Sequence, residues 1–219
     1  MLEAGPRTSM REIQFINDNY YHIYNRGTDK RQIFSDNADY VRFIHYLYGF
    51  NDNKIIPNFS RDIEGGPASN IKPRDLLVEI VAFCLMPNHF HLILKQVKDG
   101  GITKFMRKLS TGYVMYFNKR NKRSGVLFQG KFKAILIDND EYLAHLSRYI
   151  HINPLEISNS NLNNYRWSSY LDYIGIKNFP SVINKATINS LFPKEIDYRD
   201  FISQFISSDL EKINHLILE

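Results

Sequence analysis

The stretch Val81–Lys95 constrains the fold of this 219-residue chain more than any other part of it. It consists of an apolar run, the tight-turn sequence Met86–Asn88 and a second apolar run, which together predict two adjacent β-strands. His89 and His91 lie two residues apart on the second predicted strand. Because strand side chains alternate between the two faces of a sheet, both imidazoles point to the same face. Two such imidazoles form part of a divalent-metal site, although they also occur as ordinary half-buried histidines.

The other periodic segments indicate how this strand pair is embedded. Aromatic and β-branched residues predict strands, apolar residues at helical spacing predict helices, and Asp36 is a plausible helix N-cap. The order strand, helix, strand, strand, helix, strand, helix predicts an α+β fold: a ferredoxin-like antiparallel sheet with helices packed on one face. Weak helical patterns after Gly175 add a small helical C-terminal appendage. The predicted strands are 20–26, 76–86, 89–96 and 126–137, and the predicted helices are 36–48, 102–121 and 140–152, the last capped by Asp138 or Asp140.

Positive charge is concentrated in one segment. Between Gly100 and Ile137 there are nine basic residues and no Asp or Glu, whereas the remainder has 19 basic and 23 acidic residues. This distribution is typical of a protein with a polyanionic partner, most simply nucleic acid, although a solvated basic helix has the same composition. Arg26, on the first predicted strand, is a further candidate phosphate ligand. The nine are Lys104, Arg107, Lys108, Lys119, Arg120, Lys122, Arg123, Lys131 and Lys133.

Composition also bears on the compartment. Cys84 is the only cysteine, so the chain has no disulfide framework, which favours a reducing cytoplasm. We find no signal peptide and no apolar run long enough to span a bilayer, so we expect no membrane partner. Together with the basic segment, this predicts a cytoplasmic, nucleoid-associated protein.

A second group of polar residues lies at the end of the last predicted helix. Tyr149 and Asn153 are four residues apart, so a helix places them on the same face, one above the other. The phenol of Tyr149 is a possible nucleophile, and the amide oxygen of Asn153 is a possible third metal ligand. Taken alone the pair is only suggestive, because a tyrosine here is often a core residue and an asparagine before Pro154 often ends a helix.

Five segments together resemble a known family: Leu85–Leu92 (LMPNHFHL), Leu127–Ala134 (LFQGKFKA), Asp140–Leu143 (DEYL), Arg148–Pro154 (RYIHINP) and Trp167–Tyr170 (WSSY). They are similar to segments of the IS200/IS605-like single-tyrosine HUH transposases, and most similar to the transposases associated with repetitive extragenic palindromes. The resemblance extends from about residue 20 to residue 173. Each motif is weak alone, but Met-Pro-Asn-His-x-His followed by Tyr-Ile-x-x-Asn-Pro is a strong compound signature.

The resemblance implies a role for each matching residue. His89, His91 and Asn153 would hold a divalent metal, Mg²⁺ or Mn²⁺, and Tyr149 would be the nucleophile. The family cleaves single-stranded DNA, often beside a hairpin, through a covalent 5′-phosphotyrosine link that leaves a free 3′-OH. Some relatives act as homodimers. On this basis residues 1–9 are a leader or tag expected to be disordered, 10–174 form the catalytic domain, and 175–219 are a helical extension of unknown role.

Three alternatives remain open at this point. The chain could be a non-catalytic ferredoxin-like module that binds nucleic acid, or a domesticated enzyme that processes hairpins for its host. Tyr113 and Tyr116, in the basic segment, are a second pair of candidate nucleophiles, although their spacing also fits the apolar stripe of a core-facing helix. Several aromatic residues could stack on bases or pack in the core: Tyr20, Tyr21, Tyr24, Trp167 and Tyr170.

Overall fold

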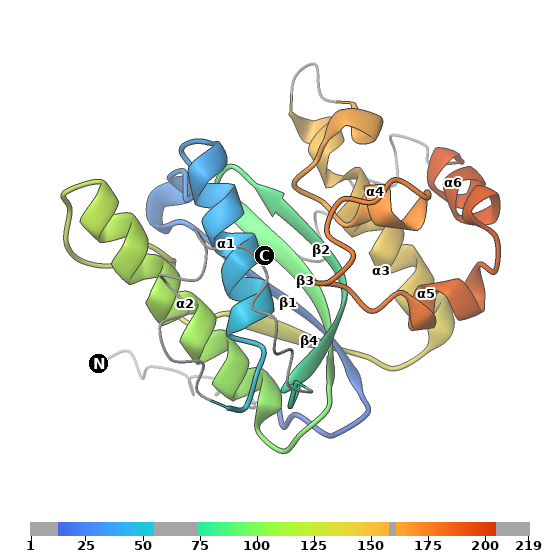
Figure 1. Cartoon of the computed structure of the whole chain (residues 1–219), viewed down its shortest axis with the longest axis horizontal. Coiled ribbons are helices and arrows are strands. Elements are labelled where there is room, and N and C mark those ends of the chain that lie inside the picture. Colours follow the sequence, from blue (N-terminus) through green and yellow to red (C-terminus); the bar gives the residue numbers. More distant parts are fainter. Residues whose placement is uncertain (1–12, 55–73, 158–160, 205–219) are drawn as a thin grey trace, which may run out of the picture.

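The structure, a computed structural model, describes residues 13–54, 74–157 and 161–204. The predicted leader at residues 1–9, most of the long polar loop at residues 51–74 and the end of the C-terminal extension lie outside these ranges. Within them, a four-stranded antiparallel sheet has the strand order β2-β3-β1-β4, which is the ferredoxin-like arrangement (Figure 1). The predicted α+β class is confirmed. The strands are β1 (Tyr20–Arg26), β2 (Val78–Met86), β3 (His89–Gln96) and β4 (Lys133–Ile137).

The strand with the two histidines is one of the two central strands. β3 pairs with β2 on one side and with β1 on the other. Its turn is fixed by the segment after β1, because the Pro87 carbonyl accepts hydrogen bonds from the amides of Ile33 and Phe34 and the Asn88 carbonyl accepts one from Gly27. This part of the sheet is therefore rigid, which is what a site with defined geometry requires.

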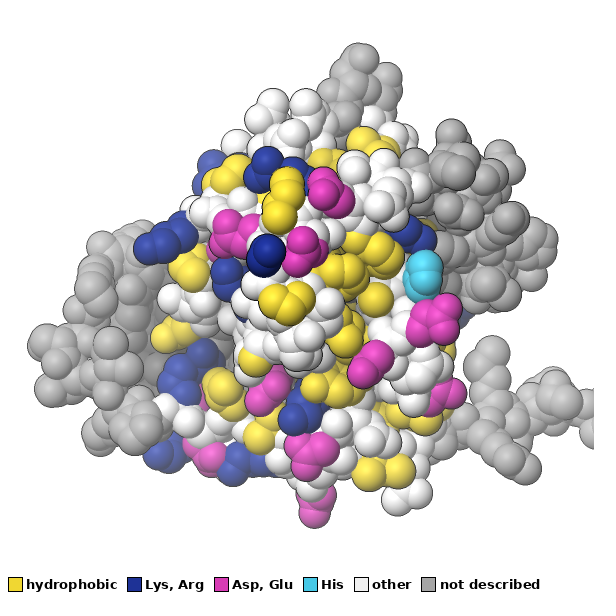
Figure 2. Space-filling view, turned by 90° about the vertical axis from the view of Figure 1, so that its right-hand side faces the viewer, with side chains coloured by type: hydrophobic (Ala, Val, Ile, Leu, Met, Phe, Trp, Pro, Cys, Tyr) yellow, Lys and Arg dark blue, Asp and Glu magenta, His cyan; other side chains and the backbone are white. Residues whose placement is uncertain are grey.

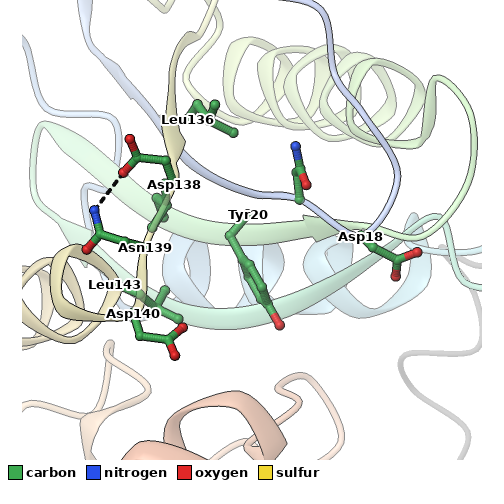
Figure 3. Close-up of a pocket in the computed structure, with 9 residues that line it drawn as sticks. Asp18, Tyr20, Leu136, Asp138, Asn139, Asp140 and Leu143 are labelled. Atoms are coloured by element: carbon green, nitrogen blue, oxygen red, sulfur yellow. Dashed lines mark hydrogen bonds between the residues drawn. The ribbon is translucent and has the colours of Figure 1, made fainter.

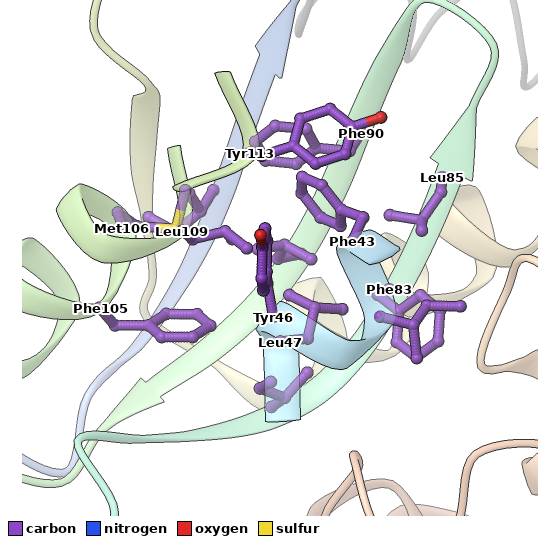
Figure 4. Close-up of a cluster of buried hydrophobic side chains, with 14 of the residues drawn as sticks. Phe43, Tyr46, Leu47, Phe83, Leu85, Phe90, Phe105, Met106, Leu109 and Tyr113 are labelled. Atoms are coloured by element: carbon purple, nitrogen blue, oxygen red, sulfur yellow. The ribbon is translucent and has the colours of Figure 1, made fainter. Parts of the chain in front are cut away.

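One face of the sheet is covered by α1 (Asn37–Gly49) and α2 (Gly101–Arg120). Phe90, Leu92 and Leu94 of β3 point into this core, where Phe90 packs against Phe43 of α1 with ring centroids 5.2 Å apart (Figure 4). These are the alternate residues to His89, His91 and Ile93. The period of two predicted from the sequence thus separates an apolar core face from a face with the histidines.

The expectation of helices on one face is incomplete, because helices cover both. The second face packs against α3 (Asp140–Ile152), and the short helices α4 (Tyr170–Tyr173), α5 (Ala186–Leu191) and α6 (Glu195–Ser203) join the same apolar cluster. The physical reason lies in β2, where every residue except the half-buried Glu79 is buried. A strand that is apolar on both faces requires cover on both. In the described ranges no helix is long and apolar enough to cross a membrane.

Two element boundaries correct the predictions. The N-cap of α3 is neither Asp138 nor Asp140: the side chain of Asn139 accepts a hydrogen bond from the Tyr142 amide at 2.7 Å, and the two aspartates flank it. The strand predicted from residue 126 begins only at Lys133, because Gly130 adopts a φ of 102°, which interrupts extended structure. The predicted cap of α1 is confirmed, since Asp36 accepts from the amides of Ala38 and Asp39.

The C-terminal extension is packed against α3. Ile188, Tyr198 and Ile202 are buried in the cluster that contains the α3 side chains. A buried chain of polar contacts also connects α3 to Tyr198 and to Ser169. His151 Nδ1 lies 2.6 Å from the Tyr198 hydroxyl, and His151 Nε2 lies 2.7 Å from Ser169 Oγ. Burial without any charged partner lowers the pKa of His151 to about 3. The extension therefore helps to hold α3 on the sheet.

Candidate active site

His89 is oriented by the residue before it. Its Nδ1 lies 2.7 Å from Asn88 Oδ1, and the Asn88 amide nitrogen donates to the Lys30 carbonyl at 3.3 Å. Because a carboxamide oxygen only accepts, Nδ1 of His89 carries the proton and Nε2 keeps its lone pair. Burial lowers the pKa of His89, which favours this neutral form. The lone pair on Nε2 is the one that a metal ion uses.

His91 is fully enclosed, with 0% of its surface exposed. Its Nδ1 lies 2.9 Å from Nε2 of His22 on β1, and the two rings stack with centroids 5.1 Å apart. Burial lowers the pKa of His91 well below its ordinary value, with smaller contributions from His89 and His22. Its Nε2 is buried and has no hydrogen-bond partner in the described residues.

Asn153 joins α3 to the histidine strand. It follows the last residue of α3, is 0% exposed, and places its Oδ1 3.1 Å from Nε2 of His89. With His89 protonated on Nδ1, these are two acceptor atoms facing each other, and the contact becomes favourable when a cation binds both. Neighbouring ligands in an octahedral Mg²⁺ shell are also about 3 Å apart, given metal–oxygen distances near 2.1 Å.

The residues present therefore fit a divalent ion. His89 Nε2, His91 Nε2 and Asn153 Oδ1 are the donor atoms, and two of them lack a satisfactory partner without an ion. No group of three or more His, Cys, Asp or Glu side chains in the described residues is arranged to hold a metal. The amide of Asn153 is thus the group beside the histidine pair that could supply a third ligand, the role that the resembling motif implies for it.

Tyr149 lies against this group. Its ring centroid is 5.5 Å from that of His91, in an edge-on arrangement, and it is 1% exposed. Burial raises the pKa of Tyr149 to about 12, and a side-chain hydrogen bond with Asn153 opposes the rise. All four predicted site residues are therefore brought together, from β3 and the C-terminal end of α3.

The alternative nucleophiles lie on the other face of the sheet. Tyr113 is 0% exposed in the core beneath α1 and α2, and its hydroxyl donates to the Ile33 carbonyl at 2.5 Å. Tyr116 is half-buried on the same helix and lies under the guanidinium of Arg42, 5.0 Å from the ring centroid. The core interpretation of this pair is the one that the geometry supports.

The aromatic residues that were candidates for stacking on bases also divide between the packed core and the histidine face. Tyr21 is buried in the α1/α2 core, and Trp167 stacks on Tyr40 with ring centroids 4.6 Å apart. Tyr170 is buried beside α3. Only Tyr20 and Tyr24 are half-buried on the histidine face, where the ring of Tyr24 stacks on His22 and His91.

The basic residues divide between the two faces. Arg26 and Lys133 lie on the histidine face: Arg26 pairs with His89 in the sheet register, and Lys133 pairs with Tyr24, its Nζ 5.8 Å from the ring centroid. The basic helix α2 lies on the opposite face. Figure 2 shows that on the side of the molecule formed by α3 to α6 positive and negative side chains are interspersed.

Several cations of α2 are engaged within the protein. Arg120 bridges Asp36 and the fully buried Asp39 at the start of α1, both at 2.5 Å. Lys104 and Lys108 donate to Asn53 Oδ1 and to the Asp52 carbonyl at the end of α1. The remaining basic residues of the segment are placed as follows: Arg123 is half-buried and bonded to Asn118, whereas Arg107, Lys119, Lys122 and Lys131 are exposed.

A shallow pocket lies at the other end of β1 from the histidines. Its lining includes Tyr20 and the carboxylates of Asp18, Asp138 and Asp140 (Figure 3). Three carboxylates repel phosphate, so this pocket does not serve the DNA chemistry that the histidine site suits.

Sequence reasoning missed two residues of the site. The sequence pattern places Asn88 only in a turn, and it gives His22 no other potential ligand at a suitable spacing. Each contacts a ring nitrogen of one member of the histidine pair. For His22 the signal was its alternation with Tyr20 and Tyr24 on β1, but the pairing of β1 with β3 was required to use it.

The fold and the site together define a class: a ferredoxin-like α+β protein with a strand-borne histidine pair facing a tyrosine helix. Comparison with known families gives the same answer, since the model for IS200-like transposases matches residues 70–153. The chain thus carries an IS200-like transposase segment, and the family resemblance seen in the sequence is confirmed. No curated protein matches the chain.

Two of the solved structures that match this chain differ in how similar they are to it. One, described as a REP-associated tyrosine transposase bound to a REP hairpin, has a TM-score of 0.53 and 15% identity, covering 78% of this chain and 90% of that one. It shows that the fold is shared. The other, tRNA(His) guanylyltransferase from Saccharomyces cerevisiae, has a TM-score of 0.38 and 10% identity, covering 92% and 78%, which is too distant to bear on fold or function.

Proposed function

We propose that this protein is a metal-dependent single-stranded DNA endonuclease and strand transferase that cleaves beside hairpins through a 5′-phosphotyrosine intermediate. One observation carries the proposal: Tyr149 lies against a group of three possible metal-donor atoms, those of His89, His91 and Asn153, two of which lack a satisfactory partner without a cation. A module that only binds nucleic acid has no need of such a set. The match to IS200-like transposases supports the same class of enzyme.

Each residue of the site has a defined task. His89, His91 and Asn153 would hold Mg²⁺ or Mn²⁺, which would supply a Lewis acid to orient phosphate oxygens and offset the charge that develops on them. The three ligands are neutral and leave the charge of the ion available to the substrate. Tyr149 supplies the nucleophilic oxygen from a helix that Asn153 and the C-terminal extension hold in place.

The bond changes balance without a further reactant. The Tyr149 oxygen attacks phosphorus and the bond from phosphorus to the 3′-oxygen breaks, so the products are a 5′-phosphotyrosine and a free 3′-OH that receives the phenol proton. Because a buried phenol is a poor nucleophile, the reaction requires that its proton be lost as the phosphate binds. Tyr149 is also almost fully enclosed, so DNA binding must open the site.

The basic residues support two parts of the DNA. Arg26 and Lys133, on the histidine face, are suited to the backbone of the strand that enters the site. Three exposed cations away from the histidine site are available to a further segment of the DNA, such as a hairpin stem: Arg107, Lys119 and Lys122. We assign Lys104, Lys108 and Arg120 first to the contact between α1 and α2, where they are already engaged.

The assembly and location follow from this proposal. Tyr149 and the histidines of one chain already meet, so a single chain suffices for the site, and a homodimer is not required for it. Because an enzyme of this kind acts on chromosomal DNA, we expect it in the cytoplasm, associated with the nucleoid and without a membrane partner. Residues 10–174 hold the catalytic groups, and the extension after residue 175 stabilises their helix.

The proposal is tested with labelled single-stranded hairpin DNA, Mn²⁺ or Mg²⁺ and denaturing electrophoresis. We expect a covalent protein–DNA adduct in the wild type that depends on metal and disappears in Tyr149→Phe. Tyr142→Phe, a half-buried residue of the same helix, is the matched control and should still form the adduct. An adduct that persists in Tyr149→Phe would refute the assigned nucleophile. Binding of many hairpins without any cleavage would favour the non-catalytic module.

A further inference from the structure

His22 occupies a position for which the proposed chemistry has as yet no role. It lies on β1, is 0% exposed, and contacts Nδ1 of His91, the ring nitrogen other than the proposed metal-binding Nε2. Its Nε2 is 2.9 Å from His91 Nδ1, whereas its own Nδ1 is buried and has no hydrogen-bond partner in the described residues. A buried nitrogen without a hydrogen-bond partner costs stability, which leaves the contact with His91 as the polar interaction of this side chain among the described residues.

The contact restricts the tautomers of the two rings. The contact joins two ring nitrogens 2.9 Å apart, so the His22–His91 hydrogen bond contains one proton. If that proton is on Nδ1 of His91, then Nε2 of His91 has a free lone pair. If it is on Nε2 of His22, then Nε2 of His91 carries a hydrogen that blocks metal binding. Only the first arrangement gives a metal ligand.

We propose that His22 is a positioning residue that accepts the Nδ1 proton of His91 and thereby fixes the tautomer and ring orientation in which His91 binds the metal ion. Asn88 performs the corresponding task for His89, with an oxygen 2.7 Å from Nδ1. The two rings of the pair would then be set by neighbours of different kinds, one an amide from the turn and one an imidazole from the adjacent strand. The inference rests on the proposed metal-dependent function.

The geometry around His22 supports orientation as well as proton placement. The three rings of Tyr24, His22 and His91 form a stack, with interplanar angles of 20° to 28° between them. Rotation of the His91 ring would break both the stack and the hydrogen bond. Outer contacts of this kind usually change metal affinity 10- to 100-fold when they are lost.

The first test is metal binding, measured without substrate. Free Mn²⁺ is followed by electron paramagnetic resonance in wild type, His22→Leu, His22→Gln and the matched control His45→Leu, a half-buried histidine on the α1 face. We expect the Mn²⁺ dissociation constant to rise about 10- to 100-fold in His22→Leu. His22→Gln offers an amide oxygen to His91 Nδ1 and should recover most of the affinity, and His45→Leu should bind as the wild type does.

The outcomes separate this inference from the proposed function. If His22→Leu binds Mn²⁺ as tightly as the wild type does, the role of His22 is overturned and the proposed function still stands. If the wild type does not bind Mn²⁺, or if His91→Ala binds Mn²⁺ as tightly as the wild type, both the role of His22 and the proposed function are overturned. If His22→Leu does not fold, the wild type decides: in the Mg²⁺-saturated protein, long-range ¹H–¹⁵N correlations should show His91 and His22 both protonated on Nδ1. A proton on Nε2 of His22 would overturn the inference.

Discussion

Single residues set the chemistry of this site through their neighbours. In the proposed site, the suitability of His89 and His91 as ligands depends on what contacts their Nδ1 atoms, Asn88 and His22, and not on the His-x-His spacing alone. Asn153 has two functions, because the same side chain faces His89 and hydrogen-bonds Tyr149. Substitution of any of these side chains should therefore affect metal binding, the position of the proposed nucleophile Tyr149, or both.

Stability at acid pH tests the buried histidines at this scale. The pKa of His151 falls to about 3 in the folded protein from an ordinary value of about 6.5. The unfolded chain therefore binds a proton near pH 6.5 that the folded chain does not, and stability that is complete above pH 6.5 is lost as the pH falls toward 3. At pH 5 this one residue should cost up to about 2 kcal/mol.

Urea unfolding at pH 7 and pH 5 measures the effect. In His151→Gln the loss of unfolding free energy between the two pH values should be smaller than in the wild type by up to about 2 kcal/mol. Replacement of His145, an exposed histidine of the same helix, by Gln is the control and should leave the pH dependence as it is. Equal pH dependence in His151→Gln and wild type would show that His151 is not held neutral.

At the level of elements, each face of the sheet has a different function. The α1/α2 face is a packed core, tied at its margin by the ion pairs of Arg120 with Asp36 and Asp39. The other face carries the site between β3 and α3. The basic segment of the sequence is consequently split, since most of it forms α2 on the core side and only Lys133 and the residues near it continue onto β4 beside the site.

This division predicts unequal roles for the cations. Arg26→Gln and Lys133→Gln should each weaken binding of a short unpaired DNA strand and lower the slope of log K against log salt by about 0.7. Lys119→Gln, on α2, should not affect binding of that strand but should reduce affinity for a longer hairpin. Fluorescence anisotropy over a salt series measures all three variants. A larger effect from Lys119→Gln on the unpaired strand would place the DNA path on the α2 face instead.

For the molecule as a whole, the packing of α3 on its own sheet decides how the site is assembled. The nucleophile, its helix and the ligand strand belong to one chain, and the C-terminal extension adds Ile188, Tyr198 and Ile202 to the cluster that holds α3. Exchange of α3 between two chains would have to break this cluster and the buried contact between His151 and Tyr198. We therefore expect each chain to act alone.

A mixing experiment tests assembly. Tyr149→Phe and His91→Ala are inactive for different reasons, so a protein that exchanges its tyrosine helix would recover up to about a quarter of the wild-type sites when the two variants are combined in equal amounts. We expect no recovery of adduct formation. Wild type mixed with either variant serves as the control for inhibition. Recovered adduct would mean that Tyr149 acts on the site of a second chain.

The sequence by itself determined the local features of this protein. The period of two on β3 places His89 and His91 on one face, and the spacing of four puts Tyr149 and Asn153 on one face of α3, because both depend only on backbone geometry. The strand bounds 20–26 and 89–96 and the Asp36 cap followed from the same local rules. The compound motif then indicated the family, which the match to residues 70–153 confirmed.

Only the tertiary structure decided which of these local faces meet. The pairing of β1 with β3 brings His22 to His91, although they are 69 residues apart, and no local pattern records a contact at that separation. The position of α3 opposite α2 likewise removed most of the basic segment from the site. Strand pairing and helix packing depend on the summed burial of apolar faces across the whole chain, which is why the sequence predicted the type and order of the main elements and still left some boundaries and their mutual contacts open.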